Sequence, residues 1–314
     1  MKWLIILALG AAWIEMNAPG LEIKYRPGLE GYAKMVSSEF PATKKLTEQN
    51  LAFQSGATVN VFITKSEDDF KQVQNGAPEW ASATADPGRN AIYLKPLRDM
   101  SPNSLAETFR HELAHILLNR RLNGNRAPRW FDEGMAVLTS GELSFSRYQA
   151  LAQIVWSGRF MPFEQFDFGF PSNSADAQLA YAQSESFVSY LMDTLGPDDF
   201  KKLLDKAAGG EDFYEALHDL TGVPFTQLEA NWVNQIHRKY NIVSIVFGST
   251  SLWFLVTLLF LFAYLTRKRR LREHAQRLEL ESGYFPYQEP ENPDELEDEE
   301  EEGSNDEGGG KTWH

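Results

Sequence analysis

The stretch Phe109–Leu118 reads FRHELAHILL, and the other features of the chain are best understood outward from it. Its apolar residues recur at helical spacing, and His111 and His115 stand four residues apart with Glu112 directly after the first histidine. In a helix this spacing places both imidazoles on one face, one turn apart, so that both can bind one ion. The stretch therefore predicts a helix with two metal ligands and a carboxylate that can act on a metal-bound water.

A second stretch, Trp130–Ala136, reads WFDEGMA and offers a third ligand. Glu133 would complete a set of two histidines and one carboxylate, which leaves a coordination position open for water, as in catalytic zinc sites. The chain has no cysteine, so a metal must be held by histidine and carboxylate. We expect Zn²⁺ as cofactor, bound by His111, His115 and Glu133. The alternative, two surface histidines on an ordinary helix, does not account for the second stretch.

These stretches resemble the gluzincin branch of metallopeptidases, in which HExxH is followed by a helix with a glutamate in a W-x-x-E-G-x-A context. The positions that match this context are Trp130, Glu133, Gly134 and Ala136. The segment Tyr181–Leu191 (YAQSESFVSYL) looks like the one that follows in the peptidase MA-like group, and the resemblance covers roughly residues 21–240. It implies an α+β, zincin-like fold: a small mixed sheet with the active-site helix, then a helical subdomain, with the cleft between them.

The resemblance also implies roles for single residues. Glu112 would take a proton from the attacking water and pass it to the leaving amine. Related gluzincins place a Tyr or His from the helical subdomain where the oxyanion forms, and Tyr181 is our candidate for this second catalytic role. Simple packing of Tyr181 between helices is the alternative, and Asp176, Glu185 and His218 stay open as other candidates.

The sequence departs from known gluzincins at two places. Aminopeptidases with this zinc motif carry a G-x-M-E-N stretch, which Pro78–Asn90 lacks, so an exopeptidase is disfavoured. Thermolysin-like members carry an Asp four residues after the third ligand that orients a metal histidine, but position 137 is Val here. The hydrogen-bond partner of the metal histidines must therefore come from elsewhere.

Hydrophobic patterning predicts a sheet first and helices afterwards. Strands are expected at Leu21–Tyr25, Thr58–Thr64, Trp80–Ala85 and Ala91–Leu94. One of the last two would pair with an extended substrate by the resemblance, or both form an ordinary meander. A helix over Leu29–Asn50 should kink or divide at Pro41. Ser104 and Glu107 predict a capping box for the active-site helix, and Gly134 should let the two metal helices approach closely.

Two hydrophobic segments predict a membrane topology. The apolar run Trp3–Ala12 predicts a signal peptide over residues 1–18. Ile242–Leu265 is uncharged for 24 residues, which predicts a transmembrane helix over residues 241–266. Six basic residues follow it closely, so the tail, residues 267–314, should be cytoplasmic and the peptidase-like domain, residues 19–240, extracytoplasmic. The expected localisation is the cell membrane, with a single pass.

Most of the net charge of −14 belongs to the C-terminal tail, because residues 289–314 contain twelve Asp and Glu against one Lys. This tail should be disordered, and docking to a basic cytoplasmic partner is the alternative reading. No region is basic enough to suggest nucleic acid. The leading hypothesis is a membrane-anchored zinc endopeptidase acting on a peptide or protein. The alternatives are a binding module for envelope partners that keeps the metal, and an amidase acting on cell-wall peptide.

Overall fold

The computed structural model describes residues 13–73, 82–95, 102–140, 145–171, 174–247 and 249–282. The chain divides into two compact units, residues 1–247 and residues 248–314. The first unit contains a mixed sheet and most of the helices, and the described part of the second is the single helix α10 (Ser249–Ser282). His111, His115 and Glu133 all belong to the first unit.

The sheet has five short strands in the order β1-β2-β3-β5-β4. Their bounds are β1 (Ile14–Ala18), β2 (Leu21–Tyr25), β3 (Val59–Ile63), β4 (Ala83–Asp86) and β5 (Ala91–Leu94). The three inner strands are parallel, while β1 and β4 pair antiparallel at the two edges. Alternate residues of β2 and β3 are buried, which is the pattern of a sheet with one face on the core. Among the described strands, β4 is thus an edge strand that pairs only with β5.

Helices make up most of the remaining chain. Their bounds are α1 (Glu30–Asn50), α2 (Glu67–Val73), a 3₁₀ turn (Pro87–Arg89), α3 (Pro102–Arg121), α4 (Arg129–Thr139), α5 (Phe145–Ser157), α6 (Phe163–Phe168), α7 (Ser174–Ala208), α8 (Phe213–Thr221) and α9 (Phe225–Phe247). Helix α7 is interrupted at Gly196, whose φ of 70° lies outside the helical region and which precedes Pro197. Tyr181 and Leu195 therefore lie in the first part of α7, before this break.

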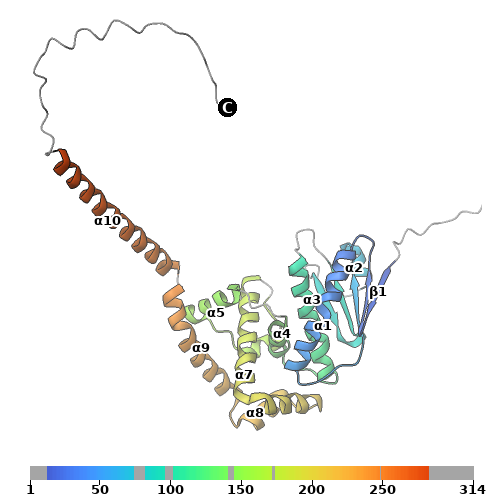
Figure 1. Ribbon diagram of the computed structural model, residues 1–314. Coiled ribbons are helices and arrows are strands. Elements are labelled where there is room, and N and C mark those ends of the chain that lie inside the picture. Colours follow the sequence, from blue (N-terminus) through green and yellow to red (C-terminus); the bar gives the residue numbers. More distant parts are fainter. Residues whose placement is uncertain are drawn as a thin grey trace, which may run out of the picture. The chain divides into compact units, whose positions relative to one another are not determined.

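Helix α3 lies between the sheet and the helical part of the first unit (Figure 1). On one side it contacts α1, β4 and β5, and on the other it contacts α4, which in turn packs on α7. Trp130 of α4 is fully buried at the centre of an aromatic cluster that includes Phe163, Phe187 and Phe225. Aromatic packing of this kind contributes both burial and ring contacts, so α4 is held firmly against the helices behind it.

Several local predictions were wrong. Strand β1 was not expected, because its residues fell within the predicted signal peptide. Pro41 lies inside α1 without dividing it. Helix α3 begins at Pro102, a first-turn position that suits proline, so Ser104 lies inside the helix and does not form a capping box with Glu107.

The predicted fold class was also wrong. The structure is mostly helical (71%) with a small mixed sheet, whereas an α+β fold with a C-terminal transmembrane helix was expected. Each strand has only four or five residues, while α7 alone has 35. The class was misjudged because the strand patterns, though present in the sequence, are short.

The transmembrane helix and the single-pass membrane localisation were wrong as well, because none of the helices within the described ranges is long and apolar enough to cross a membrane.

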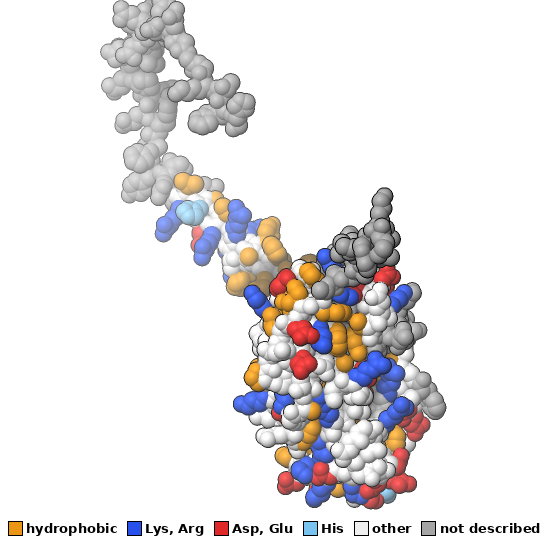
Figure 2. Space-filling view, turned by 90° about the vertical axis from the view of Figure 1, so that its right-hand side faces the viewer, with side chains coloured by type: hydrophobic (Ala, Val, Ile, Leu, Met, Phe, Trp, Pro, Cys, Tyr) orange, Lys and Arg blue, Asp and Glu red, His pale blue; other side chains and the backbone are white. Residues whose placement is uncertain are grey.

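The structure does not support the predicted signal peptide. Residues 1–12 lie outside the described residues, and Ile14–Ala18 form β1 and pair with β2. The acidic tail from residue 283 also lies outside the described residues. Figure 2 shows Lys and Arg side chains intermixed with Asp and Glu on the visible face of the first unit. The described part of this face therefore shows no separate positive or negative patch that would indicate a binding site.

Candidate metal centre

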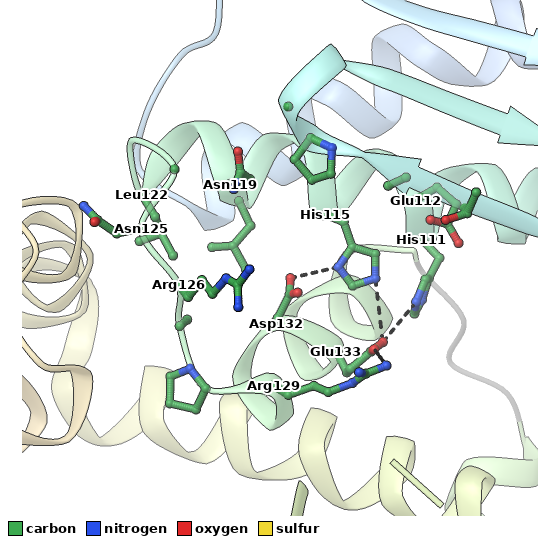
Figure 3. A pocket seen from close by; sticks show the side chains of 18 of the residues that line it. His111, Glu112, His115, Asn119, Leu122, Asn125, Arg126, Arg129, Asp132 and Glu133 are labelled. Atoms are coloured by element: carbon green, nitrogen blue, oxygen red, sulfur yellow. Dashed lines mark hydrogen bonds and ion pairs between the residues drawn. The ribbon is translucent and has the colours of Figure 1, made fainter. Parts of the chain in front are cut away.

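Helices α3 and α4 bring His111, His115 and Glu133 together (Figure 3). Their donor atoms all lie within 4.8 Å of one another. Glu133 Oε2 is 3.4 Å from His111 Nε2 and 3.6 Å from His115 Nε2, and the two imidazole rings are 4.8 Å apart. The four-residue spacing in α3 sets the two rings on one face, and the first turns of α4 place the carboxylate opposite them.

The donor set fits a metal ion. Glu133 Oε2 is buried and has no hydrogen-bond partner, although a buried carboxylate oxygen normally has one. Ligand atoms about 2.0 to 2.1 Å from a tetrahedral ion lie about 3.4 Å from one another, close to the separations seen here. Nitrogen and oxygen donors with a fourth direction open are also what a catalytic zinc site uses. The three residues therefore form a possible metal-binding triad.

The charges at the triad favour a cation. Burial would raise the pKa of Glu133, but His111, His115 and the nearby Arg129 hold it at about 2, so the carboxylate is ionised. Burial would lower the pKa of His115, yet the charge and hydrogen bond of Asp132, with Glu133 beyond it, raise that pKa to about 10. The negative charge that favours a proton on His115 also favours a metal ion in the proton's place.

Asp132 is the functional residue that sequence reasoning missed. Its Oδ1 is 2.8 Å from His115 Nδ1, so it accepts a hydrogen bond from the ring nitrogen that faces away from Glu133. This bond fixes the tautomer that presents Nε2 to a metal. Position 137, where thermolysin-like enzymes carry this partner, is the buried Val137. The sequence signal for Asp132 was its position directly before the ligand Glu133. Residues adjacent in sequence do not normally share a helical face, so this position did not suggest that both belong to one site.

A model of the Peptidase MA superfamily matches residues 42–238. The chain belongs to this superfamily of zincin-like metallopeptidases. The matched segment contains all three residues of the triad, and the superfamily is typically metal-dependent. A comparison with curated proteins found no match.

Glu112 of this Peptidase MA member is placed beside the triad. Its side chain is partly buried, and burial raises the pKa of its carboxyl group, against the opposing effects of the two histidines and of the backbone of Ala85 in the edge strand β4. Glu112 therefore lies between the sheet and the metal ligands, which come from the helices.

The triad opens into a cleft of about 930 Å³. One wall is the edge strand β4 with Pro87 and Gly88, and another is the segment between α3 and α4. Tyr181 of α7 also lines the cleft, with its ring centroid 6.2 Å from that of His111. Burial, together with the charge of Glu133, raises the pKa of the Tyr181 phenol, which therefore stays protonated at neutral pH.

The other candidates of the sequence analysis lie elsewhere. Asp176 and Glu185 are not among the described residues that line the cleft, and His218 lines a separate depression together with Tyr214. Of the alternatives for an oxyanion donor, Tyr181 is therefore the one that the structure places near the triad.

Gly134 allows a close approach, but with a different helix than expected. A Cβ atom at this position would lie 2.6 Å from the backbone oxygen of Ser184 and 2.7 Å from a methyl group of Val188, both in α7. Real Cβ atoms do not come so close to backbone atoms, so only glycine fits. The contact joins α4 to α7, not to α3, and thereby ties the residue after Glu133 to the helix that carries Tyr181.

Proposed function

We propose that this protein is a zinc-dependent endopeptidase of the gluzincin type, with His111, His115 and Glu133 as ligands of Zn²⁺. The observation that carries the proposal is the set of two partly buried histidines and one buried, ionised glutamate, with Glu112 beside it, all lining one cleft. Zinc held by such ligands would acidify a bound water and polarise the carbonyl of a peptide bond. The superfamily match supports the peptidase activity.

Glu112 would serve as the general base. Its burial raises its pKa towards the range in which a carboxylate can accept a proton and later donate it to the leaving amine. The backbone of Ala85 in β4 lies close to the Glu112 carboxylate and would help to hold it in position for the water. A metal-binding protein without catalysis would not need this residue, because Glu112 is not part of the triad.

Tyr181 would stabilise the oxyanion that forms on the scissile carbonyl. Its raised pKa keeps the hydroxyl protonated, so it can donate a hydrogen bond to a developing negative charge. The ring packs on Phe170, with centroids 4.9 Å apart, which restricts its orientation. Restriction of this kind lowers the cost of holding a donor in place during the reaction.

The edge strand β4 would bind the substrate backbone. Of the described strands it pairs with β5 alone, and its residues Ala83, Thr84 and Ala85 line the cleft. An extended peptide can add to such an edge through main-chain hydrogen bonds, which do not depend on side chains. A peptide bound in this way would continue past the triad in both directions, as cleavage of an internal bond requires.

Two variants of the full chain test the proposal. Glu112→Gln should keep zinc and lose about 10²-fold or more in turnover of a mixed peptide library, because the general base is gone. Glu107→Gln, one turn earlier in the same helix, makes the same change in charge outside the triad and should keep activity. His111→Ala should lose both zinc and turnover.

Full turnover by Glu112→Gln would overturn the mechanism. No cleavage by the zinc-loaded wild type over a broad library would instead indicate a metal-retaining binding protein. Zinc content is measured separately by elemental analysis after gel filtration, so loss of metal and loss of catalysis can be told apart.

A further inference from the structure

Two arginines reach the cleft from the segment that joins α3 to α4. Arg126 lies in the connecting loop and Arg129 is the first residue of α4. They are the only Lys or Arg residues in the described lining of the cleft. Figure 3 shows both side chains directed into it, Arg129 towards Glu133 and Arg126 in the neighbourhood of Asp132. Positive charge is therefore concentrated on one wall, next to the triad.

The loop that carries Arg126 is held in place. Gly124 N–H donates to the carbonyl of Asn119 at 2.9 Å, which closes the end of α3, and Gly124 has a φ of 81° that suits glycine. The side chain of Asn125 donates to the carbonyl of Ala208, at the end of α7, at 2.9 Å. The backbone next to Arg126 is thus anchored at both α3 and α7, so its guanidinium extends from a fixed point.

Two carboxylates of the cleft, Asp132 and Asp167, already accept hydrogen bonds from other groups. Asp132 is bonded to His115, and Asp167 accepts hydrogen bonds from the Tyr214 hydroxyl at 2.6 Å and from the backbone N–H of Arg129 at 3.2 Å. These two acids are therefore bound to other groups of the site.

The two arginines differ in the contacts that their guanidinium groups make. The guanidinium of Arg129 lies 3.6 Å from Glu133 Oε1 and 5.7 Å from the ring of Phe170, and 53% of its side chain is exposed. Arg126 is exposed, and no ion pair joins it to another residue of the described ranges. Among the described residues Arg126 is thus a cation of the cleft without an ion-pair partner, whereas Arg129 already forms an ion pair with a metal ligand.

We propose that Arg126, assisted by Arg129, binds a carboxylate of the substrate close to the scissile bond. This inference rests on the proposed peptidase function and names the substrate class: a peptide with either an acidic side chain or a free C-terminal carboxylate at that point. The guanidinium group offers a planar fork of donors that matches a carboxylate, and its charge persists at all working pH values. Because Arg129 is already paired with Glu133, Arg126 supplies most of the recognition.

The test compares matched peptides on the full-length, zinc-loaded protein. One peptide carries Glu near the cleaved bond and an amidated C-terminus, a second carries Gln instead, and a third carries Gln with a free C-terminal carboxylate close to the bond. We expect kcat/KM for one of the carboxylate peptides to exceed that of the neutral peptide by about tenfold or more. The preference should weaken as salt is raised, because the arginines are partly exposed.

Variants connect the preference with the arginine. In Arg126→Gln the ratio between carboxylate and neutral peptides should fall close to one, and in Arg126→Glu a Lys peptide should become the better substrate. Arg159→Gln is the matched control, because Arg159 is exposed, undergoes the same change in charge and does not line the cleft. It should retain the wild-type ratio.

Binding of the same peptides, labelled with a fluorophore, is measured by anisotropy on the wild type and on Glu112→Gln. A carboxylate preference that Arg126→Gln removes supports the proposal even if no peptide is cleaved, and then only the peptidase function fails. Equal binding and equal cleavage of the three peptides would overturn the proposal while leaving the peptidase function intact. Preference for the third peptide alone would assign the carboxylate to a chain terminus, and preference for the first alone to a side chain.

Discussion

Replacement of Asp132 by alanine tests how the metal histidine is positioned. In the wild type Asp132 Oδ1 lies 2.8 Å from His115 Nδ1, so it selects the tautomer whose Nε2 faces Glu133. Without Asp132, the imidazole can rotate or take the other tautomer, and both changes withdraw a ligand from the ion. We therefore expect weaker zinc binding and lower activity, with the fold unchanged.

The size of the effect follows from the exposure of the carboxylate. Loss of such a partner typically costs 10- to 100-fold in metal affinity. The Asp132 side chain is 42% exposed, so solvent screens part of its charge and the hydrogen bond accounts for most of the effect. We expect a loss of about tenfold, or about 1.4 kcal/mol, for Asp132→Ala. Asp132→Asn keeps an oxygen acceptor without the charge and should lose less.

Competition with a chromogenic zinc chelator at fixed pH measures this loss directly. Asp167→Ala is a suitable control, because Asp167 is another carboxylate of the cleft but is bonded to Tyr214 and not to a histidine. It should change zinc affinity much less than Asp132→Ala. The reasoning is refuted if Asp132→Ala binds zinc as tightly as the wild type and its circular dichroism spectrum shows an intact fold.

Three further changes give distinct outcomes. Gly134→Ala should lose about 1–3 kcal/mol in urea unfolding, because its Cβ would meet a carbonyl oxygen of α7 at 2.6 Å, whereas Gly56→Ala meets open space and should not. Asp69→Asn should cost about 3 kcal/mol near pH 7, since it removes the negative charge that pairs with Arg26 through two nitrogens at a mostly buried site. Burial opposes the shift, but the hydrogen bond from Arg26 lowers the pKa of Asp69. The wild-type advantage should therefore be complete above the unfolded pKa of about 3.9 and disappear as the pH falls through the lower folded pKa; an advantage that does not decrease as the pH is lowered below about 3.9 would contradict this. Tyr181→Phe should lower kcat by about tenfold or more with zinc affinity unchanged, and unaltered kcat would remove Tyr181 from the mechanism.

The metal triad could be predicted because its geometry is local. Two ligands share one helix, where spacing alone decides which face they occupy, and the third lies in a stretch whose residues match a known context. Asp132 could not be predicted in the same way. Its contact with His115 depends on how α4 is rotated against α3, and that rotation is set by packing of the buried Trp130 and Phe131.

The errors in the fold have a similar origin. The uncharged composition of Ile242–Leu265 predicts a transmembrane helix, but none of the helices in the described ranges is long and apolar enough to cross a membrane. Likewise, the residues of β1 follow an apolar run that looks like a leader, so their pairing with β2 was not considered.

The contact at Gly134 couples the position of the metal ligand Glu133 to the position of Tyr181, the proposed oxyanion donor. Glu133 precedes it on α4, Tyr181 lies one turn before Ser184 on α7, and the two helices touch where Gly134 meets the Ser184 carbonyl. A side chain at position 134 would separate the helices and move Tyr181 away from the triad. Gly134→Ala should therefore lower kcat in the fraction that remains folded, beyond its effect on stability. The Tyr181→Phe variant then provides the comparison: if the displacement of Tyr181 is the cause, adding Gly134→Ala to Tyr181→Phe should cost little further kcat.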